Sequence, residues 1–149
     1  MSNPADMNRN QNEYLVRFFP KDPGRVLDVG CGTGEGADRY RLLGASEVIG
    51  VELVPEKAKL AAHKLDKVYC DNIELMELPF EPGSFDTIVC SDIIEHLFNP
   101  WGTMRRLAAL LANTGTLLAS VPNLANYTIL LNILGGSFPY TEWGLLDRK

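Results

Sequence analysis

Glycines alternate with other residues just after a short apolar run near the N-terminus. Residues 26–36 read VLDVGCGTGEG, with an acid at position 28 and glycines at positions 30, 32, 34 and 36. Glycine has no Cβ, so it tolerates positive φ and lets the backbone approach a ligand closely. The stretch is therefore either a turn that holds a nucleotide or a simple chain reversal.

Polar side chains also end the later apolar runs. Glu52 ends one run, Asp71 and Asn72 end the next, and Ser91 and Asp92 end a third. Glu52 stands about 20 residues after the glycine turn, the spacing at which a carboxylate accepts hydrogen bonds from both hydroxyls of a ribose. These residues favour a nucleoside as the ligand.

The elements that must position these residues alternate along the chain. Strands are predicted over 25–29, 47–51, 68–70, 85–90 and 116–121, and helices over 13–19, 35–43, 55–64, 99–111 and about 125–134. The strands are continuous apolar runs, which is typical of a parallel sheet buried on both faces. We therefore predict a doubly wound, Rossmann-like α/β fold with a mostly parallel sheet and helices on both faces. Ligands of such sheets bind at the carboxyl ends of the strands, where the polar residues would gather.

The length of 149 residues predicts one domain over 12–149, with its core at 24–123, after a flexible tail over 1–11. The net charge is −5, and adjacent basic residues are few, Arg105-Arg106 and Arg148-Lys149, so no nucleic-acid partner is expected.

The three cysteines, Cys31, Cys70 and Cys90, are far apart and lack the spacing of a zinc site or a disulfide framework. We expect buried thiols in a reducing compartment and no bound metal. The polar N-terminus has no signal-peptide pattern, and the apolar stretch 127–134 is far shorter than the roughly 20 residues that span a bilayer. A soluble, cytoplasmic protein is expected.

A dinucleotide-binding domain is a rival interpretation of the glycine turn. Residues 32–37 fit the permissive pattern G-x-G-x-x-A. However, the turn already begins at Gly30, and Asp28 lies just inside the strand. Glu35 would also stand at the start of the helix, where a pyrophosphate favours neutral or positive surroundings.

The segments LDVGCGTG, VIGVE, CDNIE and FDTIVCSDIIEHLFNP occur in this order. Together, over about residues 24–123, they resemble the motifs of class I S-adenosylmethionine-dependent methyltransferases. EHLFNP and SVPNLANY resemble the type 11, 12 and 23 groups of small-molecule methyltransferases. The tail LLNILGGSFPYTEWGLLDR is similar to bacterial members associated with cell-surface polysaccharide synthesis.

The resemblance implies the cofactor S-adenosylmethionine, the product S-adenosylhomocysteine and a small-molecule acceptor, such as a sugar or a lipid-linked intermediate. The resemblance further implies that the glycines pass beneath the methionine part of the cofactor. It implies that Asp28 orients the amino group of the cofactor and that Glu52 holds its ribose. Asp71 accepts from the adenine amino group, and Ser91 lies near the sulfonium. The residues implied for cofactor binding are Asp28, Gly30, Cys31, Gly32, Gly34, Glu52, Leu53, Asp71, Asn72, Ile73 and Ser91.

His96 is the candidate catalytic residue. Methyl transfer from a sulfonium is an in-line displacement, and much of the enzyme's work is orienting the reacting atoms. An oxygen nucleophile usually needs a base, and His96 follows the fourth predicted strand by a few residues. The alternative is that His96 is a structural residue that packs the loop. Asp92 and Glu95 are weaker candidates for the catalytic residue.

Class I methyltransferases have seven strands, whereas five are found here, so we expect a fold that lacks the C-terminal strands. The edge of the fifth strand and the apolar residues after it favour self-association. Two other functions stay open: a module that binds the cofactor without turnover, and an NAD(P)-binding domain.

Overall fold

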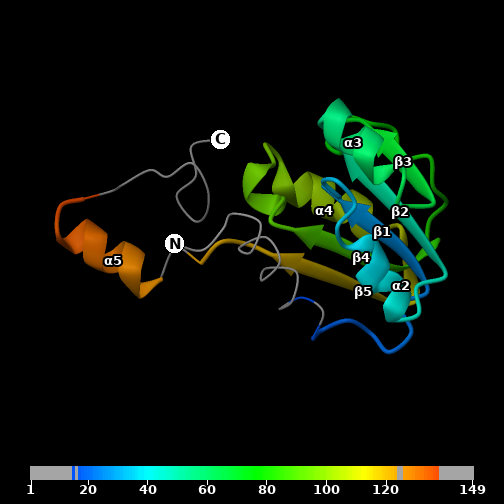
Figure 1. Cartoon of the computed structure of the whole chain (residues 1–149), viewed down its shortest axis with the longest axis horizontal. Coiled ribbons are helices and arrows are strands. Elements are labelled where there is room, and N and C mark those ends of the chain that lie inside the picture. The colour runs from blue at the N-terminus through cyan, green and yellow to red at the C-terminus, as the bar shows by residue number, and fades with distance from the viewer. Residues whose placement is uncertain (1–14, 16, 124–125, 138–149) are drawn as a thin grey trace.

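A five-stranded parallel sheet forms the centre of the part of the chain that the computed structural model describes, residues 15, 17–123 and 126–137 (Figure 1). The strand order is β3-β2-β1-β4-β5, and every neighbouring pair is parallel. The strands are β1 (Arg25–Val29), β2 (Glu47–Glu52), β3 (Lys67–Cys70), β4 (Phe85–Ser91) and β5 (Leu111–Ser120). The predicted parallel sheet is confirmed.

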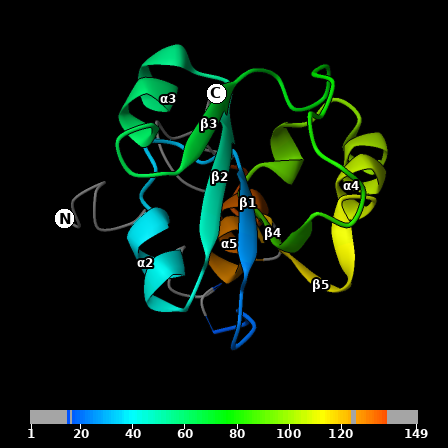
Figure 2. The same cartoon turned by 90° about the vertical axis from the view of Figure 1, so that its right-hand side faces the viewer.

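Helices cover both faces of the sheet, as predicted. The helices are α2 (Ala37–Leu42), α3 (Pro55–Ala61), α4 (Pro100–Ala108) and α5 (Tyr127–Leu134), with a short 3-10 helix η1 (Ile94–His96). Figure 2 shows α2 and α3 on one side of the sheet and α4 on the other. The fold is therefore doubly wound.

Each face of the sheet carries its own apolar core, because successive residues of a strand point to opposite faces. On the α2 and α3 side, Val26 packs in one cluster with Tyr40 and Ala61. On the α4 side, Leu27 packs in a second cluster with Leu107. Both faces of β1 are thus fully buried, which explains why its sequence is apolar without alternation.

The register brings the carboxyl ends of the strands to one edge. Glu52 at the end of β2 pairs with Cys70 at the end of β3, and Ser91 at the end of β4 pairs with Ser120 at the end of β5. Because the glycine turn leaves β1 between β2 and β4, it lies in the middle of this edge. The polar strand ends predicted from the sequence therefore meet.

The boundary between α4 and β5 differs from the prediction of a helix to residue 111 and a strand from residue 116. The carbonyl of Ala109 accepts from the amide of Gly83 at 3.1 Å, and that of Leu110 accepts from Phe85 at 3.0 Å. These bonds to the loop before β4 turn the chain into a strand at once. Phe85 pairs with Leu111, and Thr87 pairs with Thr116. A register shift between these two pairs accommodates residues 112–115.

Other boundaries move by a few residues. The helix predicted over 55–64 ends at Ala61, and the one predicted from 125 begins at Tyr127. The predicted tail, residues 138–149 and residues 13, 14 and 16 of the helix predicted over 13–19 lie outside the described residues. Residues 17 and 18 form a turn, so the second half of that predicted helix is not helical. Among the helices that the structure describes, none combines the length and apolar character needed to cross a bilayer.

Candidate functional site

The glycine turn after β1 depends on backbone conformations that other residues adopt with strain. Gly30, Gly32 and Gly34 have φ values of 74°, 57° and 75°. A Cβ on Gly30 would stand 2.9 Å from Cδ1 of Ile93, and one on Gly34 would stand 2.7 Å from Cδ1 of Leu65. Glycine is therefore required here both for the turn and for close packing against the neighbouring segments.

Glu52 fastens this turn to the end of β2. Its Oε2 accepts a hydrogen bond from the amide of Gly32 at 2.9 Å, and its Oε1 accepts from the amide of Val54 at 2.9 Å. The residue is buried, with 7% of its surface exposed. Each carboxylate oxygen has two lone pairs, so both retain capacity for another donor.

Asp28 lies beneath the turn in a low-dielectric setting. It is 5% exposed, and its Oδ2 accepts a hydrogen bond from the hydroxyl of Tyr40 at 3.2 Å. Burial raises the pKa of Asp28 to about 7, against the lowering effect of the Tyr40 hydrogen bond, and the charges of Glu52 and Glu35 raise it further. Asp28 is thus poised to change charge near neutral pH, and a cation placed nearby would favour its ionised form.

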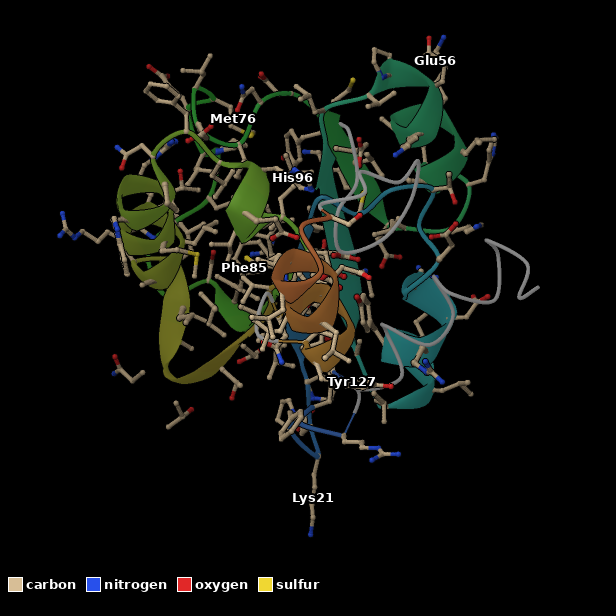
Figure 3. All side chains as sticks on the ribbon, turned by 90° about the vertical axis from the view of Figure 1, so that its left-hand side faces the viewer. Lys21, Glu56, Met76, Phe85, His96 and Tyr127 are labelled. Carbon is tan, nitrogen blue, oxygen red and sulfur yellow. The ribbon has the colours of Figure 1, made fainter. Side chains whose placement is uncertain are left out.

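A pocket of about 120 Å³ opens beside the turn at the carboxyl edge of the sheet. Figure 3 shows His96 toward this edge, at the opposite end of the strands from Lys21. The lining residues come from the ends of β1, β2 and β3 and from the segment that contains η1. They are Gly30, Val51, Leu53, Asp71, Asn72, Ile73, Glu74, Ile93, His96 and Leu97.

Five residues implied for cofactor binding line this pocket together with His96: Gly30, Leu53, Asp71, Asn72 and Ile73. Asp28, Cys31, Gly32, Gly34 and Glu52 belong to the turn and its support and do not line the pocket. Cys31 is buried, and burial raises the pKa of its thiol to about 12, which makes it a packing residue rather than a nucleophile.

Asn72 shapes the loop after β3. Its side-chain Oδ1 accepts from the amide of Glu74 at 2.9 Å, and its carbonyl accepts from the amides of Leu75 and Met76 at 3.0 and 2.9 Å. The carboxylate of Asp71, in turn, accepts from the amide of Asn72 at 2.7 Å. The loop is thereby folded tightly against the pocket.

Ser91 lies away from the pocket lining, in a polar cluster at the ends of β4 and β5. Its hydroxyl is 3.3 Å from that of Ser120 and 3.4 Å from Oδ2 of Asp92. Asp92 is the sole non-glycine residue of positive φ, at 52°, among the described residues. The hydroxyl of Ser120 donates to Oδ1 of Asp92 at 3.0 Å, which helps hold this conformation at the start of the segment that leads to η1.

Sequence reasoning missed several pocket residues. Ile93 and Leu97 line the pocket as apolar neighbours of His96, and Glu74 lines it from the loop after β3. All three lie inside the segments FDTIVCSDIIEHLFNP and CDNIE, so the segments, though not these individual residues, could be identified from the sequence. No sequence pattern distinguishes an inward-facing residue of an irregular loop, because such a loop has no fixed period.

Comparisons with known proteins identify the family of the chain. Residues 5–145 match the model of a family described as "Methyltransferase domain". Over 131 residues the chain is 37% identical to a ubiquinone biosynthesis O-methyltransferase from Xanthomonas campestris pv. campestris, covering 85% of this chain and 54% of the relative. The chain thus spans about half the length of the curated relatives it matches.

Solved structures share the fold. A protein from Pyrococcus horikoshii superposes with a TM-score of 0.70 at 20% identity, covering 91% of this chain and 63% of the other. An S-adenosylmethionine-dependent methyltransferase from Mesorhizobium loti superposes with a TM-score of 0.67 at 23% identity, covering 74% and 52%.

Proposed function

Because the chain belongs to the methyltransferase domain family, we propose that its pocket binds S-adenosylmethionine and that the protein transfers a methyl group to a small-molecule acceptor. One observation carries the proposal: a single pocket joins the glycine turn, the polar loop after β3 and His96. A cationic cofactor with amino, diol and adenine donors needs hydrogen-bond acceptors, and this edge of the sheet supplies them.

The acceptor groups divide among the parts of the cofactor. The adenine ring lies against Ile73, with Asp71 as acceptor for its amino group, and Leu53 flanks it. The ribose hydroxyls donate to Glu52, whose two oxygens have spare lone pairs. The methionine part crosses Gly30 and Gly32, near Asp28. Gly34, Cys31, Asn72 and Ser91 then act by shaping the walls.

The proposed role of His96 is to hold and remove the acceptor's proton. The bound cofactor supplies an electrophilic methyl group on a sulfonium, and the acceptor oxygen attacks it in line. The imidazole is exposed and lines the pocket, so an acceptor that enters from solvent meets it directly. Imidazole is the side chain that most often acts as a general base in enzymes.

The acceptor is best sought among small hydroxylated molecules. The name of the Xanthomonas relative favours an oxygen as the methylated atom. The sequence resemblance had favoured polysaccharide intermediates, and the relative named above belongs instead to ubiquinone biosynthesis. We propose hydroxylated aromatic compounds first and sugars second, with the cytoplasm as the site of action.

Calorimetric titration with S-adenosylmethionine, S-adenosylhomocysteine and NAD tests cofactor binding. We expect saturable binding of the first two and none of NAD. Saturable binding of NAD alone would overturn the proposal in favour of the dinucleotide-binding interpretation. Methyl transfer from labelled cofactor to catechols, phenols and sugars then identifies the acceptor.

A cofactor-binding module without turnover is the second candidate. The same titrations separate it from an enzyme: cofactor binding without methyl transfer to any acceptor, in the chain and in any longer form of the protein, would support it.

A further inference from the structure

Two segments without strand pairing face each other across the pocket. Residues 71–76, which we call the β3 wall, contribute Asp71, Asn72, Ile73 and Glu74 to the lining. Residues 93–99, which we call the η1 wall, contribute Ile93, His96 and Leu97. Because neither wall is fixed by the sheet ladder, side chains must set the spacing between them.

Glu74 reaches from the β3 wall to the η1 wall. Its Oε2 accepts a hydrogen bond from the amide of Phe98 at 3.0 Å, and its Oε1 accepts from the amide of Asn99 at 2.7 Å. Amides at the start of a helix lack intrahelical partners, and Asn99 is the N-cap of α4. These two bonds, the one to Asn99 first, lower the pKa of Glu74, so the carboxylate is ionised at neutral pH.

Arg106 reaches back from the last turn of α4 to the β3 wall. Its Nη1 donates to the carbonyls of Ile73 at 3.1 Å and Glu74 at 2.8 Å, and its Nη2 donates to the carbonyl of Met76. A half-buried guanidinium thus gathers three carbonyls of one loop. The planar fork of arginine can do this, whereas lysine offers a single point charge.

We propose that Glu74 and Arg106 form a clamp that holds the two pocket walls at the spacing that the adenine ring and His96 require. Glu74 ties the β3 wall to the start of α4, and Arg106 ties the end of α4 to the same loop, so α4 serves as a rigid spacer. Both are positioning residues, and their role in cofactor binding rests on the proposed function above.

Hydrogen exchange of the ligand-free protein tests the clamp itself. In Arg106→Met, amide exchange is expected to rise together in residues 72–76 and 96–99, with β1 and β4 unchanged. Arg105→Met is the matched control, since Arg105 is an exposed neighbour in the same turn of α4. A rise confined to one wall, or an equal rise in the control, would overturn the clamp.

Ligand binding tests its functional role. We expect Arg106→Met to weaken binding of S-adenosylhomocysteine and of 5′-methylthioadenosine by about tenfold each, because the clamp acts on the adenosine side. Arg106→Lys should recover part of the loss, and Arg105→Met should stay within about twofold of wild type. Unchanged affinities in Arg106→Met would refute the positioning role.

Failure of the clamp and failure of the proposed function are distinguishable. If the wild type binds neither ligand, the proposed function is wrong, and the exchange experiment still decides whether the clamp exists. If Arg106→Met does not fold, Glu74→Gln replaces it, because the amide retains one acceptor but loses the charge. That variant should raise exchange at Phe98 and Asn99, and an unchanged rate would overturn the clamp.

Discussion

At the scale of single residues, the buried carboxyl of Asp28 makes stability depend on pH. Burial raises its pKa from 3.8 to about 7, so folding favours the protonated form. The stabilising effect of protonation is complete below pH 3.8 and is lost as the pH rises to about 7. The ligand-free protein is therefore expected to lose about 2 to 3 kcal/mol of unfolding free energy between pH 5 and pH 8 from this group.

Asp28→Asn is the control, since an amide keeps an acceptor for the Tyr40 hydroxyl and does not titrate. Urea unfolding at several pH values measures both proteins. As the pH rises from 5 to 8, the wild type should lose unfolding free energy relative to Asp28→Asn. A difference that stays constant from pH 5 to pH 8 would show that Asp28 does not titrate in this range.

Glu52 provides a second prediction at this scale. Glu52→Ala removes the proposed ribose acceptor and also the partner of the Gly32 amide, so the turn loosens as well. We expect the affinity for S-adenosylhomocysteine to fall by at least about tenfold. Calorimetry measures it. Glu47→Ala is the control that leaves the affinity unchanged, because Glu47 lies at the opposite end of β2 from Glu52. An unaltered dissociation constant in Glu52→Ala would rule out the ribose assignment.

The position of a residue along the chain could be predicted at this scale, whereas its role stays a prediction. Gly30 and Asp71 follow strand ends, His96 follows β4 by a few residues, and all three line one pocket. The left-handed backbone of Asp92 could not be predicted, because its hydrogen-bond partner Ser120 lies on another strand. Arg106 was equally hidden, since its role depends on where α4 places it relative to a loop 30 residues earlier.

At the scale of elements, Gly34 controls how the start of α2 approaches α3. Gly34→Ala combines a φ of 75° with a Cβ placed 2.7 Å from Leu65 and 3.2 Å from Ala61. We expect a loss of about 2 to 4 kcal/mol, from backbone strain and the packing shift together. Gly136→Ala is the matched control, since Gly136 has a φ of 73° and open space around its Cβ position.

Thermal and urea unfolding compare the two variants. The control should lose only the strain component, about 1 to 2 kcal/mol. Equal losses in the two variants would show that the contact between Gly34 and α3 contributes nothing beyond strain.

Elements with strong local signals were predictable. The strands β1, β2 and β4 are mostly buried runs rich in apolar residues, and Pro55 and Pro100 mark the first turns of α3 and α4. The passage from α4 to β5 was predicted wrongly, because residues 109–115 lack a decisive local preference. Hydrogen bonds from Gly83 and Phe85, far away in sequence, decide it.

At the scale of the whole molecule, the C-terminal side of the described sheet presents apolar surface. β5 is the edge strand of the order found among the described residues. Beyond its carboxyl end lies α5 (Figure 1), which exposes Leu130, Leu131 and Leu134 by 45%, 62% and 84%. Exposed apolar residues on one helix favour association, and so does a strand edge that has no partner among the described residues. We propose that the chain self-associates through this side.

Sedimentation velocity over a range of concentrations tests this proposal. Wild type is expected to shift from monomer toward larger species as its concentration rises, and Leu131→Glu should move that shift to concentrations at least about tenfold higher. Leu42→Glu is the control, because Leu42 is 88% exposed as a single apolar residue on α2, on another part of the surface. A wild type that stays monomeric at all concentrations would exclude self-association. A control that shifts as much as Leu131→Glu would place the association surface elsewhere.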